Sequence, residues 1–146
     1  MTWKNLLDDG RVETHVTSKA ELDDLRAVVA RNLEDAAIAM LSDDNRFAIA
    51  YQAALLSSKM AIACTGYRVK GEGAHHTTFQ ALKLAMGGSV TKTADYFDRC
   101  RRKRNNLSYD SQGIVSSADA KALLEAAEKF HKLVESWIGK NYPMLA

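Results

Sequence analysis

Apolar residues recur at helical spacing over most of the chain. A capping box at Ser18–Glu21 precedes apolar positions three and four residues apart, which predicts a helix from Ser18 to about Leu41. A second helix is predicted from about Asn45 to Thr65, and its alanine-rich sequence is apolar nearly all round. Such a helix belongs at the centre of a bundle, where its neighbours approach it closely.

Three further helices are predicted in the second half of the chain. A helix of modest length runs from roughly His75 to Met86, after a loop that contains glycines. A fourth helix starts at Ser89, and a fifth is capped by Ser116 and runs to about Ile138. The inward face of the fourth helix is expected to carry Val90, Ala94, Phe97, Cys100, Arg104 and Leu107.

These elements predict an all-α fold, an up-and-down bundle of four long helices plus one short helix. The connections are short, so successive helices are expected to be antiparallel neighbours. Strand-like alternation is limited to a weak stretch from Val12 to Val16. A length of 146 residues suits one domain. We therefore interpret residues 1–146 as a single domain, with a lead-in over 1–17 and a tail over 140–146.

Composition narrows the class of protein. The chain is 47% hydrophobic and 26% charged, which is typical of a globular protein. No run approaches the 18 apolar residues of a membrane span, and the polar N-terminus is unlike a signal peptide, so we expect a soluble, cytoplasmic protein that does not contact membranes.

Cys64 and Cys100 lie in helical patterns without metal-ligand spacing and are expected to be buried thiols. Neither a metal nor a cofactor is predicted, since no motif for one occurs.

Positive charge is concentrated near the end of the fourth predicted helix. The net charge is only +2, yet five cations fall within six residues: Arg99, Arg101, Arg102, Lys103 and Arg104. On a helical wheel Arg104 lies between Cys100 and Ser108, on the side assigned to the core. A charge in that place needs a partner or a ligand, because removing it from water is costly. Arg104 is therefore the strongest single candidate for function.

Structural interpretations of the same residues stay open. Cations near a helix C-terminus are favoured by the helix dipole, and an internal ion pair with Asp98 or Asp110 would satisfy Arg104. The adjacent His75 and His76 at a helix start are expected to be exposed or to supply minor packing, with anion binding as the alternative. His131 is expected on the surface of the last helix.

The helix pattern and the basic segment resemble the HEPN superfamily. The resemblance covers Ser18 to Ile138 as a pattern of helices and includes Arg104-Asn105 near the end of the fourth helix. In that superfamily an arginine, usually followed by a polar residue, precedes a histidine by a few positions. In this chain Tyr109 occupies the place expected for the histidine, after four intervening residues.

This resemblance implies a homodimer that binds RNA and, in active members, cleaves it without a metal. The ribose 2′-hydroxyl attacks the adjacent phosphate, the histidine assists proton transfer, and the arginine stabilises the developing charge. The resemblance implies Arg104, Asn105 and Tyr109 as catalytic residues. The cations implied to bind nucleic acid are Arg99, Arg101, Arg102 and Lys103. A tyrosine with an ordinary pKa near 10 is a poor base at neutral pH, so the sequence predicts weak or absent cleavage.

Two classes of function follow from the sequence. The first is a prokaryotic toxin or defence protein that binds RNA or a nucleotide and acts as a metal-independent endoribonuclease. The second is a non-catalytic helical module that binds a protein partner, such as a nucleotidyltransferase-like antitoxin. Tyr109 in the histidine position disfavours catalysis and so makes the first class less favoured and the second class more favoured.

Overall fold

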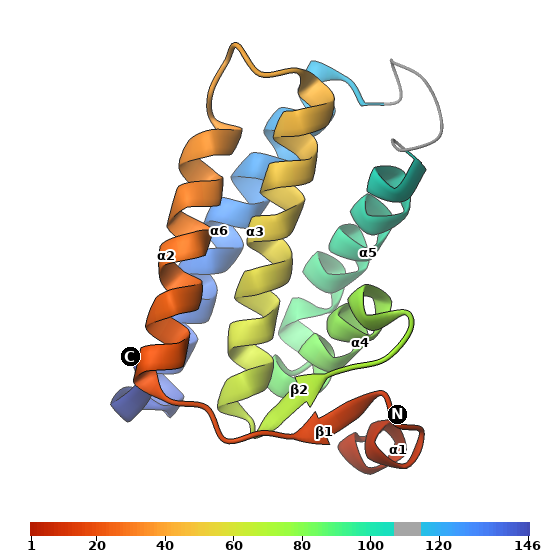
Figure 1. Ribbon diagram of the computed structural model, residues 1–146, viewed down its shortest axis with the longest axis vertical. Coiled ribbons are helices and arrows are strands. Elements are labelled where there is room, and N and C mark those ends of the chain that lie inside the picture. The colour runs from red at the N-terminus through yellow and green to blue at the C-terminus, as the bar shows by residue number, and fades with distance from the viewer. Residues whose placement is uncertain (107–114) are drawn as a thin grey trace.

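Helices make up almost the whole of the computed structural model, which describes residues 1–106 and 115–146 (Figure 1). The elements in chain order are α1 (Trp3–Asp8), β1 (Val12–Thr14), α2 (Lys19–Ala36), α3 (Asp43–Cys64), β2 (Tyr67–Val69), α4 (Ala74–Met86), η1 (Gly88–Val90), α5 (Thr91–Asn106), α6 (Ser117–Asn141) and η2 (Pro143–Leu145). The predicted all-α class is confirmed, with two short strands added to it.

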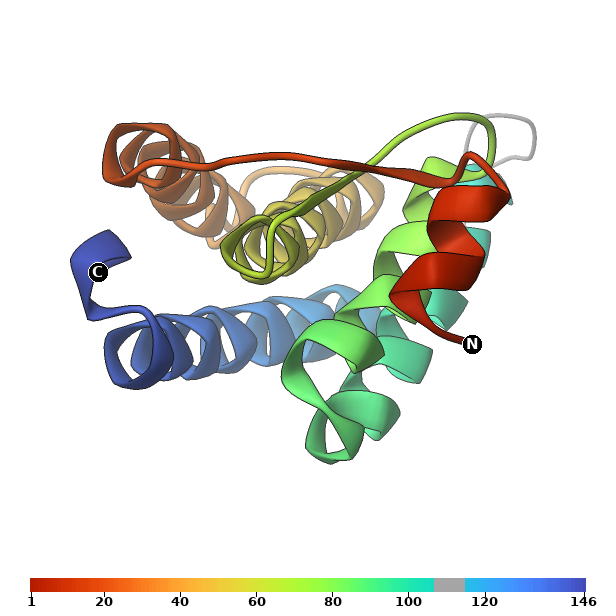
Figure 2. The ribbon, with the colours of Figure 1, turned by 90° about the horizontal axis from the view of Figure 1, so that it is seen from below.

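Helix α3 forms the centre of the bundle, as its alanine-rich sequence predicts. Seen from below, α2 and α6 flank α3, while α4 and α5 cover its remaining side (Figure 2). By length and composition alone α3 could cross a membrane, but 78% of its most apolar window is buried inside the bundle. The apolar surface of α3 is therefore used by the core.

A series of aromatic side chains fixes α4, α5 and α6 against α3. The Tyr51 ring lies edge-on to Phe79 at 6.0 Å between ring centres, and Phe79 lies 5.9 Å from Phe97. Phe97 then meets Phe130 of α6 edge-on at 5.2 Å. Such tilted pairs contribute packing energy beyond the area they bury. They hold the start of α4 and the later turns of α5 at fixed positions relative to Tyr51.

The N-terminal lead-in forms a small layer of its own over the end of α3. Strands β1 and β2 pair antiparallel with Val12 opposite Val69, and Trp3 of α1 stacks on Tyr67 at 4.2 Å. The loop predicted from Tyr67 to Ala74 is therefore wrong for its first three residues. The pairing joins segments far apart in sequence, and local periodicity does not report such contacts.

Two predicted helix boundaries are also wrong. Helix α2 ends at Ala36 rather than near Leu41. The Arg46 Nε donates to the Ala36 carbonyl at 2.9 Å and so satisfies one of the carbonyls that lack a partner within the helix at its C-terminus. The apolar pattern continues through Met40, but that side chain is 96% exposed. At the start of α5, residues Gly88–Val90 form a 3₁₀ turn, so the helix begins at Thr91 instead of Ser89.

Burial shifts the pKa of two thiols and of one imidazole. Cys64 and Cys100 are buried as expected, and burial raises the pKa of each thiol to about 11. His131 was expected on the surface, but it is half-buried, with Nδ1 3.1 Å from the Ser57 hydroxyl. Burial lowers the pKa of His131. As the pH falls below about 6.5, the unfolded chain therefore binds more protons than the folded chain, and the free energy of unfolding decreases.

Arg26 joins α2 to α6 and to the C-terminal tail, and its replacement is expected to destabilise the fold. Its Nε donates to Glu135 at 2.9 Å and its Nη2 to the Leu145 carbonyl at 2.7 Å, with the side chain only 17% exposed. We expect Arg26→Met to lower the free energy of unfolding by about 1–3 kcal/mol in urea denaturation, because hydrogen bonds to charged groups are lost. Lys19→Met, which removes an exposed pair with Asp23, is the control. Equal effects of the two variants would contradict this role.

Candidate active site

Arg104 lies on the side of α5 that faces the bundle, as the helical wheel predicts. Its guanidinium carbon is 5.2 Å from the centre of the Tyr51 ring on α3, and its side chain is half-buried. A cation over an aromatic face is attracted by the negative charge of that face. Within the described residues no carboxylate pairs with Arg104, because Asp98 pairs with Arg101 and Arg102 instead. The contact that the described residues give the Arg104 guanidinium is therefore the one with the Tyr51 ring.

The same tyrosine contacts a histidine at the start of α4. The Tyr51 hydroxyl lies 3.1 Å from Nδ1 of His75. The tyrosine is fully buried, and burial raises the pKa of its hydroxyl, so the hydroxyl keeps its proton. Since the described residues offer the hydroxyl no other partner, it donates to Nδ1. A neutral His75 then carries its proton on Nε2.

The electrostatic surroundings keep His75 neutral at pH 7. Burial lowers the pKa of the imidazole most, followed by the positive charges of Arg104, Lys59 and Arg101. The shift disfavours the imidazolium, since that form would be both desolvated and repelled. His75 is therefore a neutral hydrogen-bond donor placed beside a permanently charged arginine.

The neighbouring His76 is oriented by a carboxylate. Its Nδ1 lies 3.0 Å from Oδ1 of Asp98, which also accepts from Nε of Arg101 at 2.8 Å. Burial of Asp98 opposes ionisation, but the hydrogen bonds from Arg101 and His76 outweigh it, and the pKa of Asp98 lies below its usual range. A carboxylate only accepts, so Nδ1 of His76 donates and its Nε2 holds a lone pair when the ring is neutral. The side chain is 43% exposed, which leaves the ring open to a ligand.

The two histidines therefore present opposite tautomers. His75 offers an N–H donor next to Arg104, and His76 offers a base held by Asp98. Arg101 affects both histidines, because it donates to Asp98, which holds His76, and because its charge lowers the pKa of His75. Each histidine is thus hydrogen-bonded to a residue of another helix, a contact that the sequence does not predict. A base, a neutral donor and an arginine are the groups that can take a hydroxyl proton and stabilise a phosphate.

The remaining predicted site residues are dispersed. Lys103 donates to Asp119 of α6 at 2.8 Å, which contributes most to lowering the pKa of that carboxyl to about 2. Arg99 lies over the Tyr96 ring at 5.8 Å, while Arg102 and Asn105 are exposed. The five cations therefore do not form one patch. Tyr109 and Asp110, which the sequence also placed near Arg104, lie outside the described residues.

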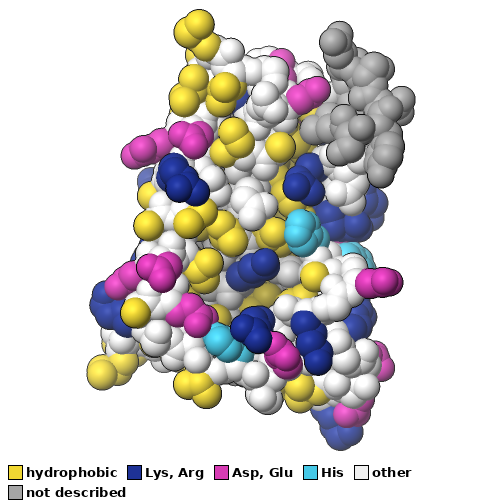
Figure 3. Space-filling view, viewed as in Figure 1, with side chains coloured by type: hydrophobic (Ala, Val, Ile, Leu, Met, Phe, Trp, Pro, Cys, Tyr) yellow, Lys and Arg dark blue, Asp and Glu magenta, His cyan; other side chains and the backbone are white. Residues whose placement is uncertain are grey.

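The surface around the site is cationic and hollowed. In the view of Figure 3, histidine and Lys or Arg side chains gather on the face formed by α3, α4 and the end of α5. Apolar side chains are visible in a hollow beside them, and acidic side chains lie mostly towards the edges of this face. This distribution suits an anionic ligand that extends beyond a single residue.

One comparison with known proteins gives a match. A family model described as SAV_6107-like HEPN matches residues 37–135, which is more than half of the chain. Searches of curated proteins and of solved structures gave no significant match. The matched region includes all of α3, α4 and α5, and so every side chain of the site described above.

Proposed function

The chain belongs to the HEPN superfamily, and from this premise we propose that Arg104, His75 and His76 form a site that binds RNA and cleaves it without a metal. The observation that carries the proposal is the connection from the Arg104 guanidinium, over the Tyr51 ring, through the Tyr51 hydroxyl to His75. Arginine matches the geometry of phosphate with paired N–H donors. Tyr51 therefore acts as a positioning residue for both groups.

The proposed roles follow from the tautomers. His76 Nε2 takes the proton of a ribose 2′-hydroxyl, whose oxygen then forms a bond to the adjacent phosphorus. The bond from phosphorus to the 5′-oxygen breaks, and that oxygen receives, through water, the proton that His76 took up. The neutral His75 keeps its proton and donates a hydrogen bond from Nε2–H to a non-bridging phosphate oxygen. Arg104 stabilises the charge that develops on the non-bridging oxygens. The products are a 2′,3′-cyclic phosphate and a 5′-hydroxyl.

Asn105 and Tyr109 complete the proposed site on the strength of the sequence motif. Tyr109 keeps the role of a hydrogen-bond donor to phosphate or of a stacking surface for a base. The weak cleavage expected from the sequence assumed Tyr109 to be the acid–base partner of Arg104. The structure offers instead the imidazole of His76, whose Nε2 can take that proton, and this favours a faster reaction.

RNA binding is expected to depend strongly on salt. Arg104 and Arg101 of α5, with Lys59 on α3, displace counterions from the phosphates, so the logarithm of the affinity should fall linearly with the logarithm of salt concentration. Fluorescence polarisation with a labelled single-stranded RNA, between about 50 and 200 mM salt, measures the slope. Binding that is absent at low salt, or that does not change with salt, would remove the support for the nucleic-acid proposal.

A homodimer remains part of the proposal, on the basis of the family. Two copies that bring their α5 ends together would form one longer basic cleft, with an Arg104 from each. Sedimentation or light scattering at micromolar concentration is expected to give twice the mass of 16.1 kDa. A monomer throughout that range would exclude the shared cleft while leaving the site within one copy intact.

The second candidate function is a protein-binding module, and one groove favours it. The groove lies between α5 and α6, has a volume of about 560 Å³ and is lined by Lys92, Lys129 and Lys132 beside the half-exposed Leu133. Three lysines around apolar side chains suit an acidic partner segment, such as one from a nucleotidyltransferase-like antitoxin in the cytoplasm. RNA that is neither bound nor cleaved in EDTA would favour this function over the first.

A further inference from the structure

The first turn of α4, Ala74–Thr77, carries both histidines of the site and has no side-chain cap; we call it the histidine turn. Gly73 in the N-cap position has a left-handed backbone, with φ +68°, and no side chain to bind the free N–H groups of the turn. Gly73 and the two residues before it are exposed. The Thr77 N–H closes the turn by donating to the Gly73 carbonyl at 3.0 Å. Contacts from other parts of the chain must therefore fix the two histidines.

Three consecutive residues of the histidine turn are each held by another element. The side-chain hydrogen bonds of His75 and His76 go to α3 and α5. The third residue is the fully buried Thr77, whose hydroxyl oxygen accepts from Nε and Nη2 of Arg11 at 3.2 and 3.0 Å. Nη2 of Arg11 also donates to Oε1 of Gln80 at 2.8 Å, one turn further along α4. Arg11, in the segment between α1 and β1, thus binds the first two turns of α4.

The guanidinium of Arg11 is committed to α4. The side chain is partly buried, and the nearby carboxylate of Glu13 pairs with Arg68 and Lys70 instead. A cation removed from water needs acceptors for its donors, and the oxygens of α4 provide them. Hydrogen bonds from a charged donor are stronger than those between neutral groups, and the planar guanidinium fixes their direction. The positions of Arg11 and of the histidine turn are therefore coupled.

The layer that carries Arg11 is itself well fixed. The Arg11 N–H donates to the Leu6 carbonyl, and the Arg11 carbonyl accepts from the Lys70 N–H, both at 2.9 Å. The layer also shares a small buried core with the end of α3 and with α4, formed by Leu6, Val12, Ile62 and Ala81. The backbone of Arg11 is therefore a firm support for its side chain.

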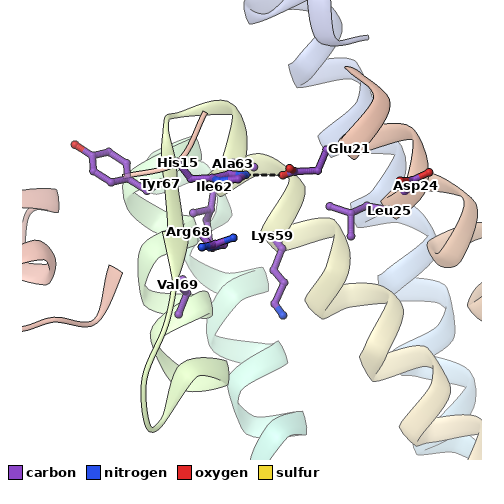
Figure 4. A pocket seen from close by; sticks show the side chains of 10 residues that line it. All are labelled: His15, Glu21, Asp24, Leu25, Lys59, Ile62, Ala63, Tyr67, Arg68 and Val69. Carbon is purple, nitrogen blue, oxygen red and sulfur yellow. Dashed lines mark hydrogen bonds and ion pairs between the residues drawn. The ribbon is translucent and has the colours of Figure 1, made fainter. Parts of the chain in front are cut away.

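A cavity separates this layer from α2. It has a volume of about 350 Å³ and lies between the start of α2, the second half of α3 and strand β2 (Figure 4). Its charged side chains balance one another, since Lys59 and Arg68 line it together with Glu21 and Asp24. The packing that holds the layer in place is therefore its packing on the end of α3 and on α4, the helix that carries the histidines.

We propose that Arg11 is a positioning residue of the site and fixes the histidine turn through Thr77. The assignment rests on the proposed cleavage function, and it extends the site to a layer that precedes the region matched by the family model, residues 37–135. Catalytic groups must lie within about 0.5 Å of their working geometry, and a displacement of about 1 Å can lower a rate about 100-fold. Loss of Arg11 therefore slows the reaction although every reacting group is still present.

Cleavage kinetics give the first test. Arg11→Met keeps the apolar stem of the side chain and removes its donors. We expect kcat to fall about tenfold with little change in KM, because the histidines are displaced while Arg104 still binds phosphate. Arg11→Lys keeps the charge without the planar set of donors, and a partial recovery of kcat is expected. Arg68→Met is the matched control and should keep the wild-type kcat, since this arginine of the same layer donates to Glu13 of the paired strand.

The imidazole rings give a second readout that needs no cleavage. In long-range ¹H–¹⁵N spectra of the full chain, the neutral rings are expected to carry the proton on Nε2 in His75 and on Nδ1 in His76. Arg11→Met should shift these signals towards a mixture of tautomers and leave those of His131 unchanged, because that ring contacts Ser57 outside the turn. Thr77→Val, which removes the acceptor of Arg11 at similar volume, should have the same effect.

Two results would overturn the proposal. One is an Arg11→Met variant that is less stable but keeps the wild-type kcat and the wild-type ring signals of both histidines. The other is a double variant, Arg11→Met with Thr77→Val, that loses more than either single variant, because Arg11 would then act by another route than Thr77.

The two readouts also separate this proposal from the proposed function. If Arg11→Met does not fold, as altered signals of His131 would show, Arg11→Lys decides by the same measurements. A wild type that cleaves no RNA contradicts the proposed function. The ring signals then still decide whether Arg11 positions the histidines.

Discussion

Arg104→Ala is expected to lower kcat/KM for RNA cleavage by about 100- to 1,000-fold, the usual cost of removing a donor that stabilises transition-state charge. Arg104 lies over the Tyr51 ring, whose hydroxyl is hydrogen-bonded to His75, and this places its guanidinium within the proposed site. Arg104→Lys keeps the charge but loses the paired N–H donors, and an intermediate loss is expected.

The measurement for Arg104 is the cleavage of a fluorescent oligoribonucleotide in EDTA at fixed salt. Arg31→Ala is the matched control, because it removes an exposed arginine of α2 away from the site. The control corrects for the general loss of positive charge. If Arg104→Ala and Arg31→Ala cleave at the same rate, Arg104 has no part in the reaction.

His75→Gln is expected to lower kcat by about 100-fold, the usual cost of removing a donor that stabilises transition-state charge. The amide oxygen of glutamine can still accept from the Tyr51 hydroxyl, so the start of α4 should keep its structure, but the amide does not place an N–H where His75 Nε2–H lies. His131→Gln is the matched control, since that half-buried ring contacts Ser57 outside the site. Equal kcat values for the two variants would assign His75 to packing.

Tyr51→Phe separates the two contacts of the tyrosine. It keeps the ring beneath Arg104 and removes the hydroxyl that fixes the tautomer of His75. We expect a loss of about tenfold in kcat with little change in KM, because substrate binding by Arg104 is preserved while His75 is less well oriented. A loss confined to KM would show that the hydroxyl serves binding alone.

Local pattern predicted most of the helices because burial of one face repeats at helical spacing. Helix α3 is the clearest case, since a sequence that is apolar nearly all round has its place in the core. The β1 and β2 pair was not predicted as a whole, because the contact between Val12 and Val69 depends on tertiary structure. The end of α2 was misplaced for a related reason, as the apolar Met40 has nothing to pack against.

The site was predicted in part. Arg104 stood out because a charge interrupted an apolar helix face. His75 and His76 did not, because their partners Tyr51 and Asp98 lie 24 and 22 residues away on other helices. Tyr51 was the available signal: a tyrosine in the middle of an alanine-rich, largely apolar helix needs a partner for its hydroxyl.

Comparing His75→Gln with Tyr109→Phe tests most directly whether His75 or Tyr109 acts with Arg104 in the reaction. The substrate is a DNA oligonucleotide with a single ribonucleotide, cleaved in EDTA. We expect the wild type and Tyr109→Phe to cut after the ribonucleotide and to leave a 2′,3′-cyclic phosphate, whereas His75→Gln does so about 100-fold more slowly. Cleavage that is lost in Tyr109→Phe and kept in His75→Gln, or a wild type that does not cut in EDTA, would contradict this expectation.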